Sequence, residues 1–292
     1  MAENKKIMIV GPPGAGKTTL KKVFFDMANP LNLLKNSLEP TRGMNSSIFS
    51  LFDSNIGIFD LAGQENENWF KKDKEVFNEA NMIICVLDIN NYLKDIFNFL
   101  NNLIDIHKEL KLRDCDIVIL LHKIDLIDRL YLQHKLKAID DFIKNKLEID
   151  FELIIYSTSI AKDYFFETYD IISEIFHKVI KHKSILTNKS IFQDFKMDLQ
   201  IILQYDDLKK YRAIDLFHDL ELSVKDANLH LKRLEKLGFI EFLENYQNFQ
   251  LTERASFFKS GLKGKKLNDK DSKVNKILES LFIFSNLNQK KN

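Results

Sequence analysis

Residues 9–20 read IVGPPGAGKTTL, which places three glycines and two prolines directly before a Lys-Thr-Thr sequence. Glycine is otherwise scarce, because the whole chain contains 9 in 292 residues. The segment fits the pattern G-x-x-x-x-G-K-[ST], and it lies after an apolar strand pattern and before a helix pattern. Backbone N–H groups and a helix N-terminus bind a polyphosphate best where φ is positive and side chains are small. The segment therefore predicts a phosphate-binding loop, and its flanking elements disfavour the alternative of a simple glycine-rich turn.

In this interpretation the Lys17 ammonium reaches the β- and γ-phosphates, and the Thr18 hydroxyl binds Mg²⁺. The residues expected to bind phosphate are Gly11, Pro12, Pro13, Gly14, Ala15, Gly16, Lys17, Thr18 and Thr19.

A second motif, FDLAGQE, follows about forty residues later. Asp60 ends a predicted strand, where its carboxylate can bind Mg²⁺ through water, and Gly63 can offer its backbone N–H to a γ-phosphate. Gln64 then lies where a side chain can orient an attacking water. By itself D-x-x-G-Q fits an ordinary strand-end turn equally well. The phosphate-binding loop before it makes a catalytic interpretation the more informative one.

Between these motifs, LEPTRGMN places Thr41 in a loop that enters the second predicted strand. A threonine hydroxyl there can complete the Mg²⁺ shell and sense the γ-phosphate, which would make the loop a nucleotide-dependent switch. Arg42 follows directly. It is either an internal arginine finger or a solvated loop arginine, and we favour the solvated residue because a finger needs a particular loop geometry.

Two later segments carry candidate base-binding residues. LLHKIDL, after the fifth predicted strand, resembles the N-K-x-D loop of small GTPases, whose Asp accepts two hydrogen bonds from guanine. Adenine offers no such pair of donors, so the resemblance implies that Asp125 is the specificity residue. The stem of Lys123 would pack on the base. In YSTSI, after the last strand, Ser159 and Ile160 resemble the small-GTPase loop whose backbone N–H contacts the guanine O6 atom.

These five elements occur in the order and spacing of a small GTPase. His122 stands where most such proteins have Asn, and HKID with STSI resembles the Rag/Gtr branch, whose members carry H-K-M-D and T-S-I. EPTRGMN is closer to the Arf pattern P-T-x-G-x-N. The resemblance covers about residues 5–182. It implies that GTP or GDP is bound with Mg²⁺, and that Gln64, Lys17 and Thr41 act in hydrolysis. It further implies Mg²⁺ binding by Thr18, Thr41 and Asp60, and guanine binding by His122, Lys123, Asp125, Ser159 and Ile160.

Short β-branched runs alternate with helical patterns over residues 6–182, which predicts a doubly wound α/β sheet with ligands at the carboxyl ends of its strands. FSLFDSNIGIF predicts a hairpin that turns at residues 53–55. The expected strands are Lys6–Val10, Ser47–Phe52, Ile56–Asp60, Met82–Asp88, Asp116–His122 and Glu152–Tyr156. The expected helices include Tyr92–Leu110, Tyr131–Leu147 and Phe165–His182.

The pattern changes after about residue 183. Predicted helices at Ile191–Tyr205, Arg212–Leu220 and Val224–Leu237 precede two short strands, FIEFL and FQLT, in an order that resembles a winged helix-turn-helix. Rag proteins instead continue into a roadblock-type domain that pairs two GTPase subunits. A basic run, KGKKLNDKDSK, and an amphipathic helix, Val274–Leu287, end the chain. We expect this helix to dock on its own protein, with membrane-surface contact as the alternative. The expected domains are 1–185, 186–260 and 261–292.

The third helix presents basic residues, but Asp226 and Glu235 share it and the wing ENYQNFQ has no basic residue. Duplex binders usually carry a denser basic footprint, so we favour protein interaction over DNA binding.

The chain is 45% hydrophobic and 29% charged with a net charge of +1, which predicts an ordinary globular protein without general attraction to nucleic acid or membranes. No signal peptide, apolar stretch of ~20 residues or lipidation signal is seen, so we expect a cytoplasmic protein with neither transmembrane segment nor lipid anchor. Cys85 and Cys115 are expected to be buried reduced thiols.

The predicted function is a Mg²⁺-dependent GTP switch with slow hydrolysis, read by regulatory or effector proteins and accelerated by an activating partner. A homodimer and a heterodimer are the oligomeric alternatives. A DNA-binding regulator with a nucleotide-sensing domain is one alternative. A scaffold that binds GTP without turnover is another, and Gln64 and Thr41 argue against it.

Overall fold

The computed structural model describes residues 3–36, 38–112, 114–147, 149, 151, 153–180, 188–244, 247–262 and 272–290. The chain divides into two compact units, each formed by discontinuous segments. The first unit contains Met1–Lys21, Leu38–Ser159 and Gln289–Asn292, and the second contains Lys22–Ser37 and Ile160–Asn288. The domain boundaries expected from the sequence, 1–185, 186–260 and 261–292, stay a prediction.

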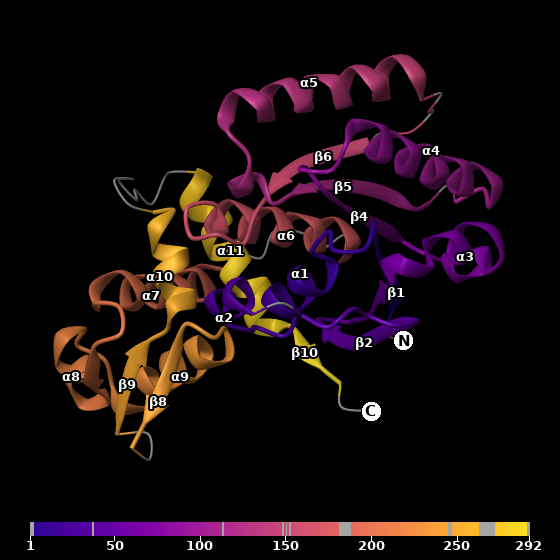
Figure 1. The fold of residues 1–292 in the computed structure, drawn as a ribbon. Helices are drawn as coiled ribbons and strands as arrows, with labels where there is room; N and C mark the ends of the chain where they lie inside the picture. The colour runs from indigo at the N-terminus through magenta and orange to yellow at the C-terminus, as the bar shows by residue number, and fades with distance from the viewer. Residues whose placement is uncertain are drawn as a thin grey trace. The chain divides into compact units, whose positions relative to one another are not determined.

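The first unit contains a mostly parallel sheet, as expected from the strand–helix alternation in the sequence (Figure 1). Its strands run in the order β10-β2-β3-β1-β4-β5-β6, and β2 is antiparallel to β3. The bounds are β1 Glu3–Val10, β2 Met44–Leu51, β3 Ser54–Leu61, β4 Met82–Asp88, β5 Asp116–His122, β6 Leu153–Thr158 and β10 Asn288–Gln289.

The central strands are apolar on both faces because both faces of a parallel sheet are covered. All seven residues of β4 except Asp88 are buried, and so are all of β5 except Asp116. Helices α4 (Leu93–Glu109) and α5 (Arg129–Lys146) pack on one face of the sheet, where side chains from both join the core of the first unit (Figure 1). Cys85 and Cys115 are buried free thiols, as expected, although Cys115 lies just before β5 rather than in it.

Strand register aligns the carboxyl ends at one edge of the sheet. Ile9 on β1 is paired with Asp60 on β3. In the same way, Asp88, His122 and Thr158 lie side by side on β4, β5 and β6. Helix α1 (Lys17–Phe24) begins after the loop that follows β1. Residues far apart in sequence are therefore gathered where a doubly wound fold places its ligands.

The second unit contains a smaller antiparallel sheet of order β7-β9-β8. From Phe165 onward, the second unit contains α6 (Phe165–Ile180), α7 (Lys189–Gln204), β7 (Lys210–Arg212), α8 (Ala213–Asp219), α9 (Val224–Lys236), β8 (Ile240–Leu243), β9 (Asn248–Leu251), α10 (Glu253–Ser260) and α11 (Ser272–Asn286). Helix α9 starts where the Ser223 side chain accepts a hydrogen bond from the Asp226 N–H, a typical N-cap. The order from α7 to β9 suits a winged helix, and that assignment stays a prediction.

An aromatic cluster around Tyr169 forms the core of the second unit. The Tyr169 ring lies 4.5 Å from the ring of Phe284 on α11 and 5.2 Å from that of Phe258 on α10. Fully buried Arg254 donates hydrogen bonds to the Leu237 and Val23 carbonyls. Helix α11 packs on α6 and buries Ile277, Leu278, Leu281 and Phe284, which confirms that this helix docks on its own protein.

Several short elements differ from the sequence expectation. The hairpin turns at residues 52–53 instead of 53–55, with Phe52 at φ 52°. Strands β7 and β10, and helices α2 (Pro30–Lys35), α3 (Asn66–Lys71) and α10, were not expected. Such short segments depend on tertiary packing more than on their own periodicity. The expected basic run lies almost wholly outside the described residues, and so does part of the wing.

No helix in the described ranges combines the length and the apolar character that crossing a membrane requires.

Candidate functional site

The loop between β1 and α1 has the backbone that phosphate binding requires. Gly11, Gly14 and Gly16 have φ values of 151°, 73° and 103°. A β-carbon on Gly11 would lie 2.0 Å from the carbonyl oxygen of Val86 on β4, so only glycine fits against that strand. The left-handed conformations turn the backbone so that its N–H groups can converge on an anion.

Lys17 is 6% exposed and folds back on this loop. Its Nζ atom donates hydrogen bonds to the Gly11 and Pro12 carbonyls, at 2.8 and 2.9 Å. Burial lowers the pKa of Lys17 to about 8, and the nearby Asp60 carboxylate opposes that shift. The ammonium is thus held next to the expected phosphate position with little water around it.

The three residues expected to surround Mg²⁺ lie together. The Thr18 hydroxyl donates to Asp60 Oδ2 at 2.6 Å, and its oxygen lies 2.8 Å from the Thr41 hydroxyl. Asp60 is fully buried, and its Oδ1 atom has no hydrogen-bond partner among the described residues. Burial raises the pKa of Asp60, and the Thr18 hydrogen bond and Lys17 charge oppose the rise. A buried carboxylate oxygen without a partner, beside two hydroxyls, suits a hard cation that also binds phosphate and water.

The loop after β3 approaches the phosphate loop through Gly63. A β-carbon on Gly63 would lie 2.5 Å from the Pro13 nitrogen and 2.7 Å from the Lys17 Nζ atom, so glycine permits this approach. Gln64 is exposed in the 3-10 turn η1 (Gly63–Glu65). Gln64 therefore lies in the loop after β3, next to the phosphate loop, and its side chain is exposed to solvent.

Sequence analysis missed two residues that connect these loops. Glu65 accepts a hydrogen bond from the Gly43 backbone N–H at 2.7 Å, which links the Thr41 loop to the Gln64 loop. Asn66 donates from Nδ2 to the Gly11 carbonyl at 3.0 Å. Their position directly after Gln64 was the available signal, because polar side chains at the end of such a loop face the same site.

His122 packs against the phosphate loop at Gly16. Its ring Nδ1 lies 3.1 Å from the Thr158 hydroxyl, and a β-carbon on Gly16 would lie 2.5 Å from its Cδ2 atom. Burial, together with the nearby Lys123 charge, lowers the pKa of His122 to about 4. The imidazole is therefore neutral at pH 7 and acts as a packing and hydrogen-bonding group. Thr158 was also missed, although it lies inside the STSI segment.

Lys123 joins the base-side segment to the phosphate loop. It has φ 65° and donates from Nζ to the Gly14 carbonyl and to Asp88 Oδ2, both at 2.7 Å. Burial acts to raise the pKa of Asp88, but hydrogen bonds from Lys123 and Asn90 outweigh it and hold the pKa below its usual range. Asp88, at the end of β4, is a further residue that the sequence interpretation did not include.

The Ser159 hydroxyl donates to Asp125 Oδ1 at 2.5 Å, which brings the HKID and STSI segments together. One Asp125 oxygen is thereby oriented by a buried side chain. Ile160 is buried and begins the second unit. Thr19 lies in the first turn of α1, Ala15 is buried in the loop, and Arg42 is exposed.

A family model that describes the Gtr1/RagA G protein conserved region matches residues 6–207. The chain belongs to the Gtr1/RagA G protein family. Membership in the Gtr1/RagA family implies that the chain binds GTP and GDP, that it is a GTP-binding switch, and that the family's GTP hydrolysis applies to it. The matched range contains every residue of the candidate site. A search of the curated proteins finds no match.

The Gtr1/RagA match and the parallel sheet agree with the α/β GTPase fold expected from the sequence, and with the recognition of a Rag/Gtr-type protein. Proteins of the Gtr1/RagA family work with regulatory partners. The match ends at residue 207, so β7 to β9 lie beyond it.

Proposed function

We propose that this protein is a Mg²⁺-dependent GTP switch whose nucleotide and metal are held by the residues described above. The observation that carries the proposal is the convergence of Thr18, Thr41 and Asp60 beside the phosphate loop, with Asp60 Oδ1 unpartnered among the described residues. Thr18 and Thr41 would bind Mg²⁺ directly, and Asp60 would do so through water. Bound Mg²⁺ would neutralise charge on the β- and γ-phosphates.

Each remaining residue has a separate role in the proposal. Lys17 neutralises phosphate charge, and Gln64 orients the attacking water for hydrolysis. Lys123 would pack along the base, and Asp125 would accept the guanine donors with one oxygen oriented by Ser159. The backbone at Ser159 and Ile160 would contact the guanine O6 atom. Arg42, which is exposed, is proposed to be a solvated loop residue rather than an arginine finger.

The loop that contains Thr41 and the loop that contains Gln64 are proposed to change conformation together. The Glu65–Gly43 hydrogen bond joins them, so loss of the γ-phosphate at Thr41 or Gly63 would affect both. A partner protein in the cytoplasm would read that difference. Unassisted turnover on the order of 10⁻³ s⁻¹ or slower is expected, because hydrolysis without an activating partner lacks added charge stabilisation.

The second unit is proposed to contact partner proteins through a winged helix. Two of the basic residues on α9 have intramolecular partners, which weakens the DNA-binding alternative. Arg233 pairs with buried Asp198, and Lys236 donates to the Ser285 carbonyl and to Asn288. Side chains that are engaged in this way are poor contacts for a phosphate backbone.

Base specificity tests the proposal most directly. Fluorescent GDP should bind much more tightly than fluorescent ADP, and Asp125→Asn should remove the preference. Asp128→Asn is the matched control, because Asp128 is exposed and caps α5 through the Tyr131 N–H, a role that Asn also performs. Equal affinity of the wild-type protein for GDP and ADP would overturn the proposal, and so would an equal effect of the two variants.

A further inference from the structure

An open groove of about 400 Å³ lies within the second unit, between α7, α9 and α11. A volume of this size is at the lower end of small binding sites, which hold roughly 300–1,000 Å³. The groove belongs neither to the nucleotide site nor to the sheet. Its lining residues are Ile191, Asp194, Phe195, Leu229, Lys232, Arg233, Lys236, Phe282, Ser285 and Asn286.

The floor of the groove is apolar and partly open to solvent. The rings of Phe195 and Phe282 meet edge to face, with centroids 5.3 Å apart. Leu229 on α9 also lines the groove. Its side chain is 54% exposed, which is a large fraction for an apolar residue. Burying such side chains against an apolar group of a ligand is favourable.

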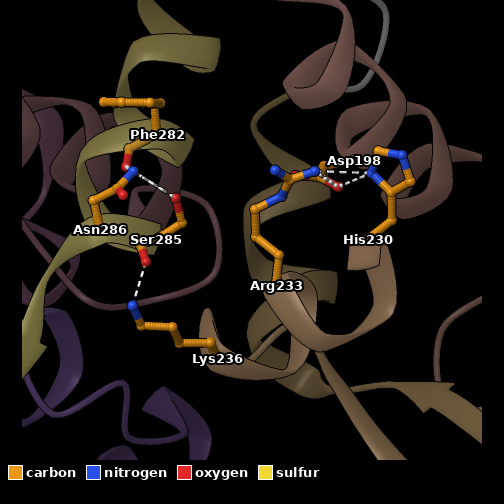
Figure 2. Close-up of polar contacts among 7 residues, drawn as sticks. All are labelled: Asp198, His230, Arg233, Lys236, Phe282, Ser285 and Asn286. Atoms are coloured by element: carbon orange, nitrogen blue, oxygen red, sulfur yellow. Dashed lines mark hydrogen bonds and ion pairs between the residues drawn. The ribbon is translucent and has the colours of Figure 1, made fainter. Parts of the chain in front are cut away.

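Arg233 forms one wall and is fixed in place. Its Nε atom lies 2.5 Å from Oδ2 of fully buried Asp198 (Figure 2). The Arg233 guanidinium also lies over the Phe195 ring, 4.4 Å from its centroid. The His230 Nδ1 atom lies 2.7 Å from Asp198 Oδ1, so Asp198 is contacted from two sides. Arg233 is therefore held in a fixed position, and the buried Asp198 carboxylate balances its positive charge.

Two lysines on the same helix form no ion pair with a carboxylate among the residues that the structure describes. Lys236 donates to two neutral acceptors, the Ser285 carbonyl and the Asn288 side chain, as Figure 2 shows for Ser285. Lys232 is exposed and forms no ion pair with any residue in the described ranges. The only carboxylate that lines the described groove is Asp194, on α7. The α9 side thus attracts anions next to an apolar floor.

From this arrangement we infer that the groove binds a short acidic segment of a partner protein. An aromatic or aliphatic side chain of the segment occupies the floor between Phe195, Phe282 and Leu229. A nearby Asp or Glu pairs with Lys232, whose ammonium is exposed. Because Asp194 on α7 repels carboxylates, the segment binds with its own carboxylates facing α9. A nucleic-acid backbone offers phosphate but no apolar group for the floor, so it fits less well.

The inference does not rest on nucleotide binding, and its test uses the full chain loaded with GDP. A random peptide library displayed on phage is selected on the immobilised protein, and the enriched consensus is synthesised with a fluorescent label. The enriched peptides should carry Asp or Glu within about four residues of a large apolar residue, since that spacing keeps both side chains on one face of a segment. Binding is then measured by fluorescence polarisation.

The variants are chosen to keep the fold. Lys232→Glu reverses an exposed charge, and Leu229→Asp places a carboxylate at the open edge of the floor. Lys225→Glu is the matched control, because Lys225 is an exposed lysine on the same helix that does not line the groove. Lys236 is left unchanged because it connects α9 to the end of α11. Melting curves and fluorescent GDP binding report whether each variant is folded.

The affinity of the consensus peptide should fall about tenfold or more in Lys232→Glu and in Leu229→Asp, and should change less than about twofold in Lys225→Glu. Three results would overturn the inference: no enrichment over uncoated support, enriched peptides that lack acidic residues, or equal binding to all three variants. Binding of a labelled DNA duplex that is lost only in Lys232→Glu, without peptide enrichment, would instead support a nucleic-acid surface and also overturn it.

Discussion

The imidazole of His122 occupies the space in which a side chain at Gly16 would begin. A β-carbon on Gly16 would stand 2.5 Å from the Cδ2 atom of His122 and 3.0 Å from its Nε2 atom. The histidine that marks the Rag/Gtr resemblance is therefore also the group that packs against the last glycine of the phosphate loop. Because His122 is buried at the end of β5, this contact sets how closely the loop approaches that strand.

Gly16→Ala should weaken GDP binding far more than Gly14→Ala does. Both glycines have positive φ, so each alanine costs about 1–2 kcal/mol of backbone strain. Only Gly16→Ala adds an overlap with His122, since nothing lies within 4 Å of the corresponding point at Gly14. Equilibrium titration with fluorescent GDP measures the difference. Adding His122→Ala should recover part of the loss in Gly16→Ala, with a coupling energy of about 1–3 kcal/mol. Equal losses in the two single variants would contradict the packing argument.

Nucleotide binding should take up a proton at Lys17. The free protein holds the pKa of Lys17 at about 8 through burial, and bound phosphates would raise it. At pH 7 about a tenth of the lysine is neutral and at pH 8 about half, so proton uptake should rise from about 0.1 to about 0.5 per GDP bound. Affinity should accordingly fall as the pH rises above 8. Calorimetry in buffers of different ionisation enthalpy measures the uptake, and heats that do not depend on the buffer would refute the prediction.

Stability should fall in acid because His122 is buried as a neutral group. Its folded pKa of about 4 lies below its unfolded value of about 6.5, so the unfolded chain binds the extra proton between those values. The free energy of unfolding should then drop by about 2–3 kcal/mol between pH 7 and pH 4.5 from this residue alone. His122→Asn cannot bind that proton and should lose less over the same range. Urea denaturation of both proteins at the two pH values provides the measurement, and parallel losses would rule His122 out as the cause.

Gln64→Leu should slow hydrolysis and leave nucleotide affinity nearly unchanged. Gln64 is exposed beside the phosphate loop, so its replacement removes a water-orienting amide without disturbing the core. Single-turnover hydrolysis of GTP should become about tenfold slower or more. Asn66→Ala is an informative comparison, because Asn66 bonds to the Gly11 carbonyl and its loss should also weaken binding. An unchanged rate in Gln64→Leu would remove Gln64 from the proposed mechanism.

The first half of the chain could be interpreted from sequence because its signals are local. The continuous apolar runs predicted β4 and β5 with the bounds that the structure shows, and Gly11, Gly16 and Lys17 identified the phosphate loop within one stretch. The predicted roles of Thr41, Asp60 and Asp125 came from resemblance rather than from spacing. The structure shows that Thr18 contacts both Thr41 and Asp60 and that Ser159 contacts Asp125, whereas the roles of these residues stay predictions.

What the sequence determined by itself is therefore the fold class, the family and the identity of the phosphate loop, since strand periodicity and glycine spacing are properties of neighbouring residues. Only the tertiary structure decided which distant groups meet. The Glu65–Gly43 bond, the packing of His122 against Gly16 and the Asp198–Arg233 pair each join residues from separate elements. Such pairs depend on strand register and helix packing, which no local pattern specifies, because those are fixed only when the whole core is buried.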